Sequence, residues 1–299
     1  MPLTKSHGFV LAASLGFSFI LIFSTLLKES GVSSFEQVFL RVTLGAVLLL
    51  IILRGKVVLF NKSDLSYFAF TGFVFAAFLL SGLSAIVFDA PIAVAAGLIN
   101  TQPIFTTILA CALRKENISL KKLGIILVGI VGAFLVTGIT PEQIRNLEIG
   151  LGVILSLSSG ALYAVYLFLK RQKQSCYAPL HLLFNVFLFA VPCTLIMGTI
   201  LTSFSNYPKL FGFTVPDYYQ LSLLFLFAVF STIVPYGMLN KVNPAELSPT
   251  TEGTILLLDP VLHVVWALLL FQQYVNLFQY VGIFLVLLTA LLVTKIGHR

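Results

Sequence analysis

The sequence predicts an all-α, polytopic membrane protein with ten transmembrane helices in two inverted five-helix repeats. Of its 299 residues, 59% are hydrophobic and only 10% are charged, whereas a soluble domain carries about 25% charged residues. Such a chain has too little polar surface to face water, so lipid has to solvate its outer faces. Ten apolar stretches follow one another along the chain, and they divide into two sets of five that align around a shared proline.

Each apolar stretch is close to the length of about 20 residues that a membrane-spanning helix needs. The first stretch superficially resembles a signal peptide, but it is ~20 residues long and is not followed by a small-x-small cleavage site. Short polar links separate the stretches, and we predict two units of five helices, 1–140 and 141–299. The predicted spans are 8–27, 35–53, 66–88, 91–112, 123–140, 149–169, 178–202, 218–239, 248–271 and 275–294.

The positions of Lys and Arg predict how the chain is oriented in the membrane. With the N-terminus inside, fourteen of the 18 cations lie in cytoplasmic links; Lys28, Arg145 and Lys209 lie outside, and Arg41 lies within the second span. The positive-inside rule therefore predicts that both termini are cytoplasmic, as in a multi-pass protein of a prokaryotic plasma membrane. The net charge of +7 follows from these topology signals. No basic face on a soluble module suggests a nucleic-acid partner.

The two halves match residue by residue. Because each half has an odd number of spans, the second copy crosses the membrane in the opposite direction, as in many secondary transporters. The link after the fourth span holds four cations and its counterpart around Gln272 holds none, as expected for copies of opposite orientation. Gly8, Ser14, Gly16 and Phe19 match Gly152, Ser158, Gly160 and Tyr163 at an offset of 144; 91–110 matches 248–267 at an offset of 157, with Pro103 on Pro260.

The ninth span carries a predicted polar stripe. Ionisable residues at a helix centre in a membrane cost of order 2.5–3.5 kcal/mol each, so they are candidates for function. Glu252, Asp259 and His263 are spaced i, i+7 and i+11, which places them within about 40° of one another on a continuous helix. Pro260 is expected to leave the carbonyl of Leu256 without its helical donor. An opened helix beside the Asp259 carboxylate predicts a site for a substrate amine or a proton.

Each of these groups also has a structural interpretation that the sequence leaves open. Asp259 is a candidate counter-ion of Arg41, which lies at a similar depth, and a buried pair of this kind can still switch partners. Glu252 is a candidate helix-start carboxylate favoured by the helix dipole. His263 is either a proton relay or a neutral histidine bonded to a neighbouring helix.

Further polar candidates lie near the predicted centre of the bundle. The first half lacks the charges of the ninth span, because Gln102 matches Asp259. Asn100 and Thr101 lie next to Pro103 and suit a polar metabolite or hydrogen bonds within the bundle. Asn185 matches Arg41 at an offset of 144 and is a candidate cavity residue. The candidate aromatic wall consists of Phe19, Tyr163, Tyr166 and Tyr236.

Glycines and cysteines suggest packing more than chemistry. Cys111, Cys176 and Cys193 have no ligand spacing, so neither a metal, a disulfide nor a cofactor is expected. Small residues let helices approach closely in a membrane. The glycines expected at such contacts are Gly8, Gly16, Gly124, Gly129, Gly132, Gly152 and Gly160.

These features resemble the EamA-type branch of the drug/metabolite transporter superfamily. The resemblance rests on 91–105 with its link to Glu116, on the second-half equivalent 249–262, and on Arg41 in Phe-Leu-Arg-Val-Thr. The chain has Phe19 where the family often has Trp, and Gln273 where the repeat of Glu116 falls. The resemblance implies a carrier of small organic solutes, within a range of amino acids, related metabolites and drugs.

The expected function is secondary-active transport by alternating access, with an amino acid or related metabolite as the substrate and Asp259 linking transport to proton movement. A facilitative uniporter, an exchanger or a drug exporter of the same fold remains open, and so does the choice between monomer and homodimer. An intramembrane lipid-modifying enzyme is the alternative from another class. It is disfavoured because no link holds a cluster of His, Asp and Glu.

Overall fold

The computed structural model describes residues 4–88, 90–113, 115–116, 118–139, 142, 145, 148–203, 215–272 and 274–296. The predicted boundary between 140 and 141 lies outside this part, as do Arg114, Lys209, Gln273 and Arg299. The described residues form helices and connecting turns without a strand. Nine described helical spans are long and apolar enough to cross a membrane, and a tenth helix has 17 residues. The prediction of an all-helical, ten-span membrane protein is confirmed.

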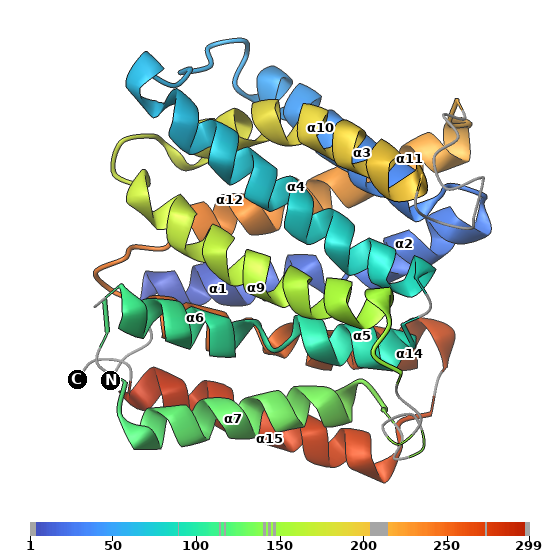
Figure 1. Ribbon diagram of the computed structural model, residues 1–299, viewed down its shortest axis with the longest axis vertical. Coiled ribbons are helices and arrows are strands. Elements are labelled where there is room, and N and C mark those ends of the chain that lie inside the picture. The colour runs from blue at the N-terminus through green and yellow to red at the C-terminus, as the bar shows by residue number, and fades with distance from the viewer. Residues whose placement is uncertain are drawn as a thin grey trace.

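Three of the ten spans, the first, fourth and ninth, each consist of two helices separated by a two-residue turn (Figure 1). The eighth span is continuous but contains a π-helical segment, and the other six are single helices. In chain order the spans are α1 (Lys5–Phe17) with α2 (Ile20–Glu29), α3 (Ser34–Ile52), α4 (Leu65–Val87) after a short turn η1 (Lys62–Asp64), α5 (Ile92–Ile99) with α6 (Gln102–Ala112), α7 (Leu120–Val136), α9 (Leu151–Gln172), α10 (Pro179–Ser203), α11 (Tyr218–Ala228) with the π-helical turn η2 (Val229–Ile233) and α12 (Val234–Asn240), α13 (Pro249–Ile255) with α14 (Leu258–Phe271), and α15 (Leu277–Ile296).

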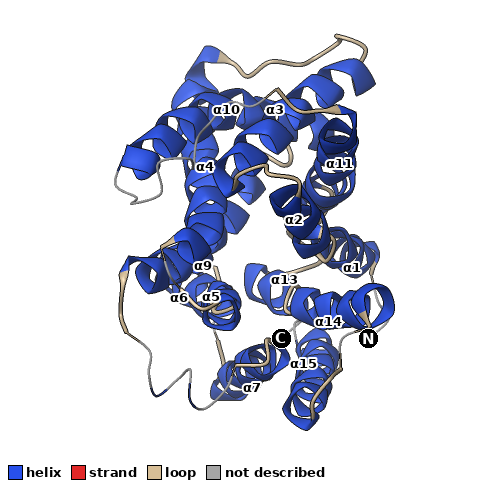
Figure 2. Ribbon diagram, turned by 90° about the vertical axis from the view of Figure 1, so that its right-hand side faces the viewer, coloured by secondary structure: helices blue, strands red, loops and turns tan. Residues whose placement is uncertain are grey.

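The equivalent helices α7 and α15 show the inverted relation of the two halves directly. They form a pair at one edge of the bundle in both views (Figures 1 and 2). Gln279 donates to the carbonyl of Val136 at 3.2 Å, whereas Thr289, further along α15, donates to Ile125, earlier in α7, at 3.3 Å. The last helices of the two repeats are therefore antiparallel, as an inverted repeat requires.

Most of the contacts between helices of different halves come in pairs that the repeat relates: such a contact has a counterpart between the equivalent helices. Helix α4 packs on α9 as α12 packs on α1, and α5 and α6 pack on α9 as α13 and α14 pack on α1. Helix α10 contacts α4 in the same way that α3 contacts α11. The first span therefore packs on the eighth and ninth spans, and the sixth packs on the third and fourth. Since the fourth and ninth spans also contact each other, the first, fourth, sixth and ninth spans meet at the centre.

Several predicted packing glycines lie at close backbone approaches. A Cβ on Gly132 would lie 3.0 Å from the carbonyl oxygen of Gly282, and a Cβ on Gly282 would lie 2.6 Å from that of Gly132. A Cβ would also lie within 3.0 Å of a neighbouring helix at four other glycines: Gly16, Gly129, Gly152 and Gly160. The prediction is wrong for Gly8 and Gly124, which have open space around the Cβ position because they face away from neighbouring helices.

The links predicted to be cytoplasmic meet at one end of the bundle, together with both described ends of the chain (Figure 1). Ser6 donates to Glu246 at 2.8 Å, and Lys173 pairs with Asp64 at 2.7 Å. At the opposite end, Gln220 donates to the carbonyl of Ser30 at 2.7 Å. Because the links predicted to be cytoplasmic lie at the same end, the fold is compatible with the orientation predicted from the charge distribution.

A second ionic contact at this end joins the two halves. Lys122 lies 2.8 Å from Glu116 and also donates to Ser248, while Glu116 accepts from the backbone N–H of Thr250 at 3.0 Å. Burial alone would raise the pKa of Glu116, but the hydrogen bonds from Lys122 and Thr250 hold that pKa below its ordinary value of 4.5. The ionised carboxylate therefore fastens α7 and the start of α13 to the link before α7.

We expect Gly282→Ala to destabilise the protein by about 1–3 kcal/mol, because its Cβ would overlap the backbone of α7. Gly124→Ala is the matched control, since nothing lies near its Cβ position. Thermal unfolding in detergent, followed by the loss of the monodisperse species, measures the difference. Equal transition temperatures for the two variants would contradict the described packing of α7 on α15.

The Glu116 contact predicts a pH-dependent stability. A depressed folded-state pKa stabilises the protein above the ordinary pKa of 4.5, and this stabilisation is lost as the pH falls through the folded-state pKa. Unfolding temperatures measured from pH 7 down to pH 3 should therefore decline less below pH 4.5 in Glu116→Gln than in wild type. Lys122→Gln should flatten the profile in the same way, because it removes the other half of the contact. A profile unchanged by either substitution would contradict the ionic contact.

Candidate functional site

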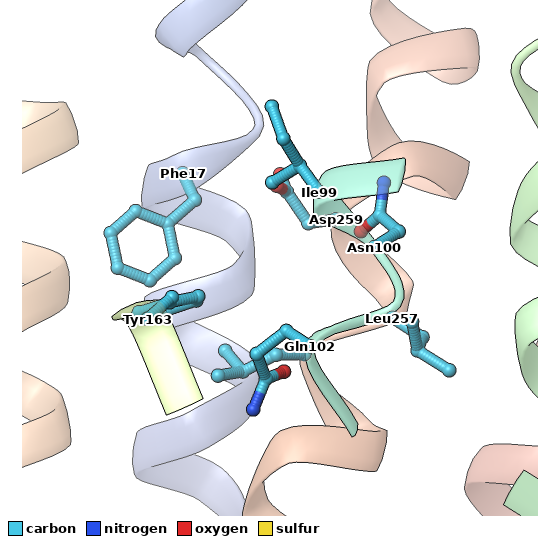
Figure 3. Close-up of a pocket in the computed structure, with 8 residues that line it drawn as sticks. Phe17, Ile99, Asn100, Gln102, Tyr163, Leu257 and Asp259 are labelled. Carbon is cyan, nitrogen blue, oxygen red and sulfur yellow. The ribbon is translucent and has the colours of Figure 1, made fainter. Parts of the chain in front are cut away.

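A cavity of about 60 Å³ lies where the first, fourth, sixth and ninth spans meet (Figure 3). These spans form two pairs that are equivalent in the repeat, so the cavity lies between the halves. The eight lining residues are Phe17, Ile99, Asn100, Gln102, Tyr163, Leu256, Leu257 and Asp259. The walls are mainly apolar, and Asp259 is the charged residue among them.

The two divided spans meet at this cavity because each is interrupted beside its proline. Between α5 and α6 the chain makes a two-residue turn, and Pro103 is the second residue of α6. Between α13 and α14 it makes a similar turn, and Pro260 is the third residue of α14. The helix breaks predicted at these prolines are present, because a proline has no N–H with which to continue the helix.

The predicted opening of the Leu256 carbonyl is wrong. In a regular helix the N–H of residue 260 would donate to this carbonyl, but Pro260 has none. The backbone N–H of the preceding residue, Asp259, donates to it instead, at 3.0 Å. The chain tightens to an i to i+3 hydrogen bond and keeps the carbonyl satisfied. The chemistry at this break therefore comes from the side chains.

The carboxylate of Asp259 is the central charge of the cavity. Its side chain is 26% exposed, and its Oδ1 atom is buried without a hydrogen-bond partner. His263, one turn further along α14, places Nε2 at 3.6 Å from Oδ1, which is too long for a hydrogen bond. Most buried polar atoms are hydrogen-bonded, so this carboxylate is available to a ligand or a proton.

Glu252 does not share the stripe of Asp259 and His263. It lies on α13, and the turn at Leu256 separates it from α14. Its fully buried carboxylate lies 2.7 Å from Nζ of Lys170 and 2.5 Å from Nη2 of Arg171. The single-stripe prediction assumed an unbroken helix and is wrong in this respect.

Lys170 and Arg171 were expected to be topology signals in a link. Helix α9 instead continues to Gln172, three residues beyond the predicted span, and carries both cations into the protein. The side chain of Lys170 is 1% exposed, and it also donates to the carbonyl of Leu239 at 2.7 Å. Because the ends of spans are placed only approximately from hydropathy, the sequence did not reveal this cluster.

Arg41 is buried, and its guanidinium lies over the ring of Phe227, 4.6 Å from the centroid. Its Nε and Nη1 atoms have no hydrogen-bond partner. Within the described residues, no ion pair joins Arg41 to Asp259. The counter-ion interpretation of Asp259 is therefore not realised in this conformation.

The amide and hydroxyl candidates separate into two groups. Asn100 lines the cavity and donates to the carbonyl of Ala96 at 2.8 Å. Thr101 is outside the lining, and its hydroxyl donates to the carbonyl of Leu98 at 2.6 Å. Asn185 is buried on α10 and donates to the carbonyl of Val58 at 3.0 Å, so it holds the link after α3 and does not face the cavity.

Gln102 is a lining residue that was not selected from the sequence. Its side chain is 4% exposed and hydrogen-bonds to Thr106. The repeat alignment did contain the signal, since Gln102 is the residue that matches Asp259. Equivalent positions of inverted halves face each other across the centre, so a partner of a strong candidate is itself a candidate.

The aromatic candidates surround the cavity unequally. Tyr163 lines it, stacks on Phe78 at a centroid distance of 5.0 Å, and has a buried hydroxyl without a partner. Tyr236 lies behind the lining and packs edge-on against Phe17 at 4.9 Å. Phe19 lies at the turn between α1 and α2, where it stacks on Trp266 at 4.8 Å and stays outside the cavity.

In the part of the chain that the structure describes, no group of three His, Cys, Asp or Glu could hold a metal ion. The three cysteines are free. The polar groups at the cavity are one carboxylate, two amides and a phenol. This set suits binding and proton exchange.

Comparison with known proteins identifies the architecture. Two segments of the chain, 4–138 and 150–295, match the model of the EamA-like transporter family. A solved structure described as "Crystal structure of protein" superposes with a TM-score of 0.77 at 15% sequence identity, and the match covers 99% of each chain. At this identity the likeness shows the shared fold. A search of curated proteins finds no match.

The buried cluster makes a testable contribution to stability. Glu252→Gln leaves Lys170 and Arg171 without their carboxylate, and breaking a buried ion pair costs about 3–5 kcal/mol. Glu246→Gln is the control, because that half-buried glutamate is held by hydrogen bonds to Ser6 and Asn243. Unfolding in detergent should show a large decrease in the free energy of unfolding for Glu252→Gln and a small decrease for Glu246→Gln. Similar losses would show that the cluster is not a structural ion pair.

Proposed function

The chain belongs to the EamA-like transporter family, and on this premise we propose that it carries amino acids or related metabolites across the membrane by alternating access. Its general class follows from the family: it is a multi-pass membrane protein that transports small solutes. The specific proposal adds the substrate class, the mode of access and the coupling to protons.

The observation that carries the proposal is the carboxylate of Asp259, whose Oδ1 is buried without a hydrogen-bond partner, at a cavity between the broken fourth and ninth spans. A buried carboxylate in a membrane protein is expensive unless a counter-charge or a proton compensates it. A protonated amine of the solute and a proton are two such partners. Because both would use the same carboxylate, binding of one would displace the other, which couples their movements.

Glu252, the fully buried acidic residue of the ninth span, has a different role. Both oxygens of Glu252 are held by Lys170 and Arg171, so its charge is already compensated. We therefore assign coupling to Asp259, with His263 as the neighbouring group that can exchange a proton with it. Glu252 instead joins α13 to α9 through its ion pairs with Lys170 and Arg171.

Alternating access is supported by the equivalence of the two halves around the cavity. Ligand pockets for small organic molecules are usually about 300–1,000 Å³, whereas this cavity measures about 60 Å³. The conformation described is therefore nearly closed around its centre. The turns at Asn100 and Leu257 are the positions where the spans can bend to admit a solute from either side.

We expect proteoliposomes that contain the wild-type protein to accumulate an amino acid or related metabolite when a proton gradient is applied. Asp259→Asn should reduce gradient-driven accumulation at least tenfold, because the amide neither ionises nor exchanges a proton. Asp217→Asn, at the exposed start of α11, is the matched control and should transport normally. Normal accumulation by Asp259→Asn would refute proton coupling and leave uniport or exchange as the mechanism.

A further inference from the structure

The spans around the cavity form two groups. The first span packs on the eighth and ninth spans, and we call these three the first-span group. The sixth span packs on the third and fourth spans, and we call these the sixth-span group. Each group supplies half of the cavity lining: Phe17, Leu256, Leu257 and Asp259 come from the first-span group, and Ile99, Asn100, Gln102 and Tyr163 come from the sixth-span group. A solute that enters the cavity therefore passes between the two groups.

On the predicted cytoplasmic side of the cavity the two groups are in close contact. Helix α6 packs on α13 there. A Cβ on Gly253 would lie 2.6 Å from Nε2 of Gln102 and 3.3 Å from Oγ1 of Thr106. The repeat-equivalent pair on the outer side is α5 and α14, and among the described residues these two helices show no comparable packing. The conformation described is therefore closed more tightly toward the cytoplasm than toward the outside.

The buried cluster of Glu252, Lys170 and Arg171 lies across this cytoplasmic contact. Glu252 belongs to the first-span group and lies one helical turn before the lining residue Leu256. Lys170 belongs to the sixth-span group and lies two turns after the lining residue Tyr163. Glu252 is 2.7 Å from Lys170 and 2.5 Å from Arg171, and no side chain of the cluster is more than 9% exposed. These ion pairs therefore join the two groups on the cytoplasmic side of the cavity.

Hydrogen bonds to the backbone join the same two groups. Lys170 donates to the carbonyl of Leu239 at 2.7 Å, and Gln174 donates to the same carbonyl at 3.1 Å. Arg171 donates to the carbonyl of Leu247 at 2.9 Å. Leu239 lies on α12 and Leu247 lies just before α13, so both acceptors belong to the first-span side. The end of α9 is thus held to the opposite group by charges and by hydrogen bonds.

The repeat shows that the other side of the cavity does without these charges. Glu252 matches Ala95 at an offset of 157, and Lys170 and Arg171 match Leu26 and Leu27 at an offset of 144. An inverted repeat places these equivalents on the outer side. The charged cluster therefore distinguishes the cytoplasmic closure from the outer one.

We propose that Glu252, Lys170 and Arg171 form the cytoplasmic gate of the cavity. Their ion pairs hold α13 against α9 in the conformation described, and they separate when the cavity opens to the cytoplasm. This inference rests on the proposed function, because alternating access requires a closure on each side of the site. Water that enters from the cytoplasm solvates the separated charges, so the gate opens without leaving a charge in apolar surroundings.

Two kinds of variant weaken this gate in different ways. Glu252→Gln leaves Lys170 and Arg171 as two buried cations without a carboxylate, which disfavours the closed conformation. Because water reaches both cations in the open conformation, the population shifts toward it. The triple variant Glu252→Ala, Lys170→Leu, Arg171→Leu copies the equivalent residues of the outer side. It removes the ion pairs without leaving a buried charge, and it therefore separates the gate from the cost of an unpaired charge.

The reactivity of a cysteine in the cavity lining reports which side is open. Ile99→Cys places a thiol in the lining, in a background where serine replaces the three native cysteines, Cys111, Cys176 and Cys193. The membrane-impermeant cation 2-(trimethylammonium)ethyl methanethiosulfonate is added to right-side-out or inside-out membrane vesicles, without a transported solute. With the gate residues unchanged, the thiol should react at least tenfold faster from the outer side than from the cytoplasmic side.

Glu252→Gln and the triple variant should each raise the cytoplasmic labelling rate at least tenfold and lower the outer rate. Lys173→Gln is the matched control. Lys173 pairs with Asp64 at the same end of the bundle, at 2.7 Å, but both residues belong to the sixth-span side, so the pair does not cross the gate. Its loss should leave both labelling rates unchanged.

Unchanged labelling rates in either gate variant would overturn the proposal and leave the cluster with a structural role alone. A rise from both sides together would show a loss of packing and would also overturn it. The proposed function is tested separately, because the labelling needs no transported solute. A protein that accumulates no amino acid can still show the shift in labelling, and one that accumulates it can fail to show the shift.

Discussion

The fourth and ninth spans of this protein are each broken beside a proline, and lipid cannot hydrogen-bond the backbone groups that a break disturbs. Both breaks therefore have to be enclosed by protein, and the fold encloses them by placing the fourth and ninth spans between the first and sixth. The same enclosure creates a small cavity lined by Asn100, at the first break, and by Asp259, just after the second. The position of the site is thus a consequence of where the prolines interrupt the helices.

Charge inside the bundle follows a second constraint, since each buried charge has to be compensated or has to serve a function. Glu252, Lys170 and Arg171 satisfy one another at the end of α9, and they hold two spans of the second half together. Asp259 Oδ1 and the Nε and Nη1 atoms of Arg41 are buried without a hydrogen-bond partner. This contrast with Glu252 is the reason why we propose the coupling role for Asp259 and not for Glu252.

The two ends of the bundle are fastened differently. At the end that carries the predicted cytoplasmic links, Asp64 pairs with Lys173, and Glu116 joins Lys122 to the start of α13. At the other end the described contacts between halves are hydrogen bonds such as that of Gln220 with Ser30. The ionic contacts therefore fasten the two halves to each other at the end that carries the predicted cytoplasmic links.

The sequence by itself determined the number of spans, the inverted repeat, the breaks at Pro103 and Pro260 and the presence of a carboxylate beside the second break. These features depend on hydropathy, spacing and proline geometry, which act within a single segment. The tertiary structure decided which groups meet. Arg171 bonds to Glu252, 81 positions away, and Asn185 bonds to Val58, 127 positions away. Such pairings depend on how each helix is rotated against its neighbours, and a pattern along one helix contains no information about that rotation.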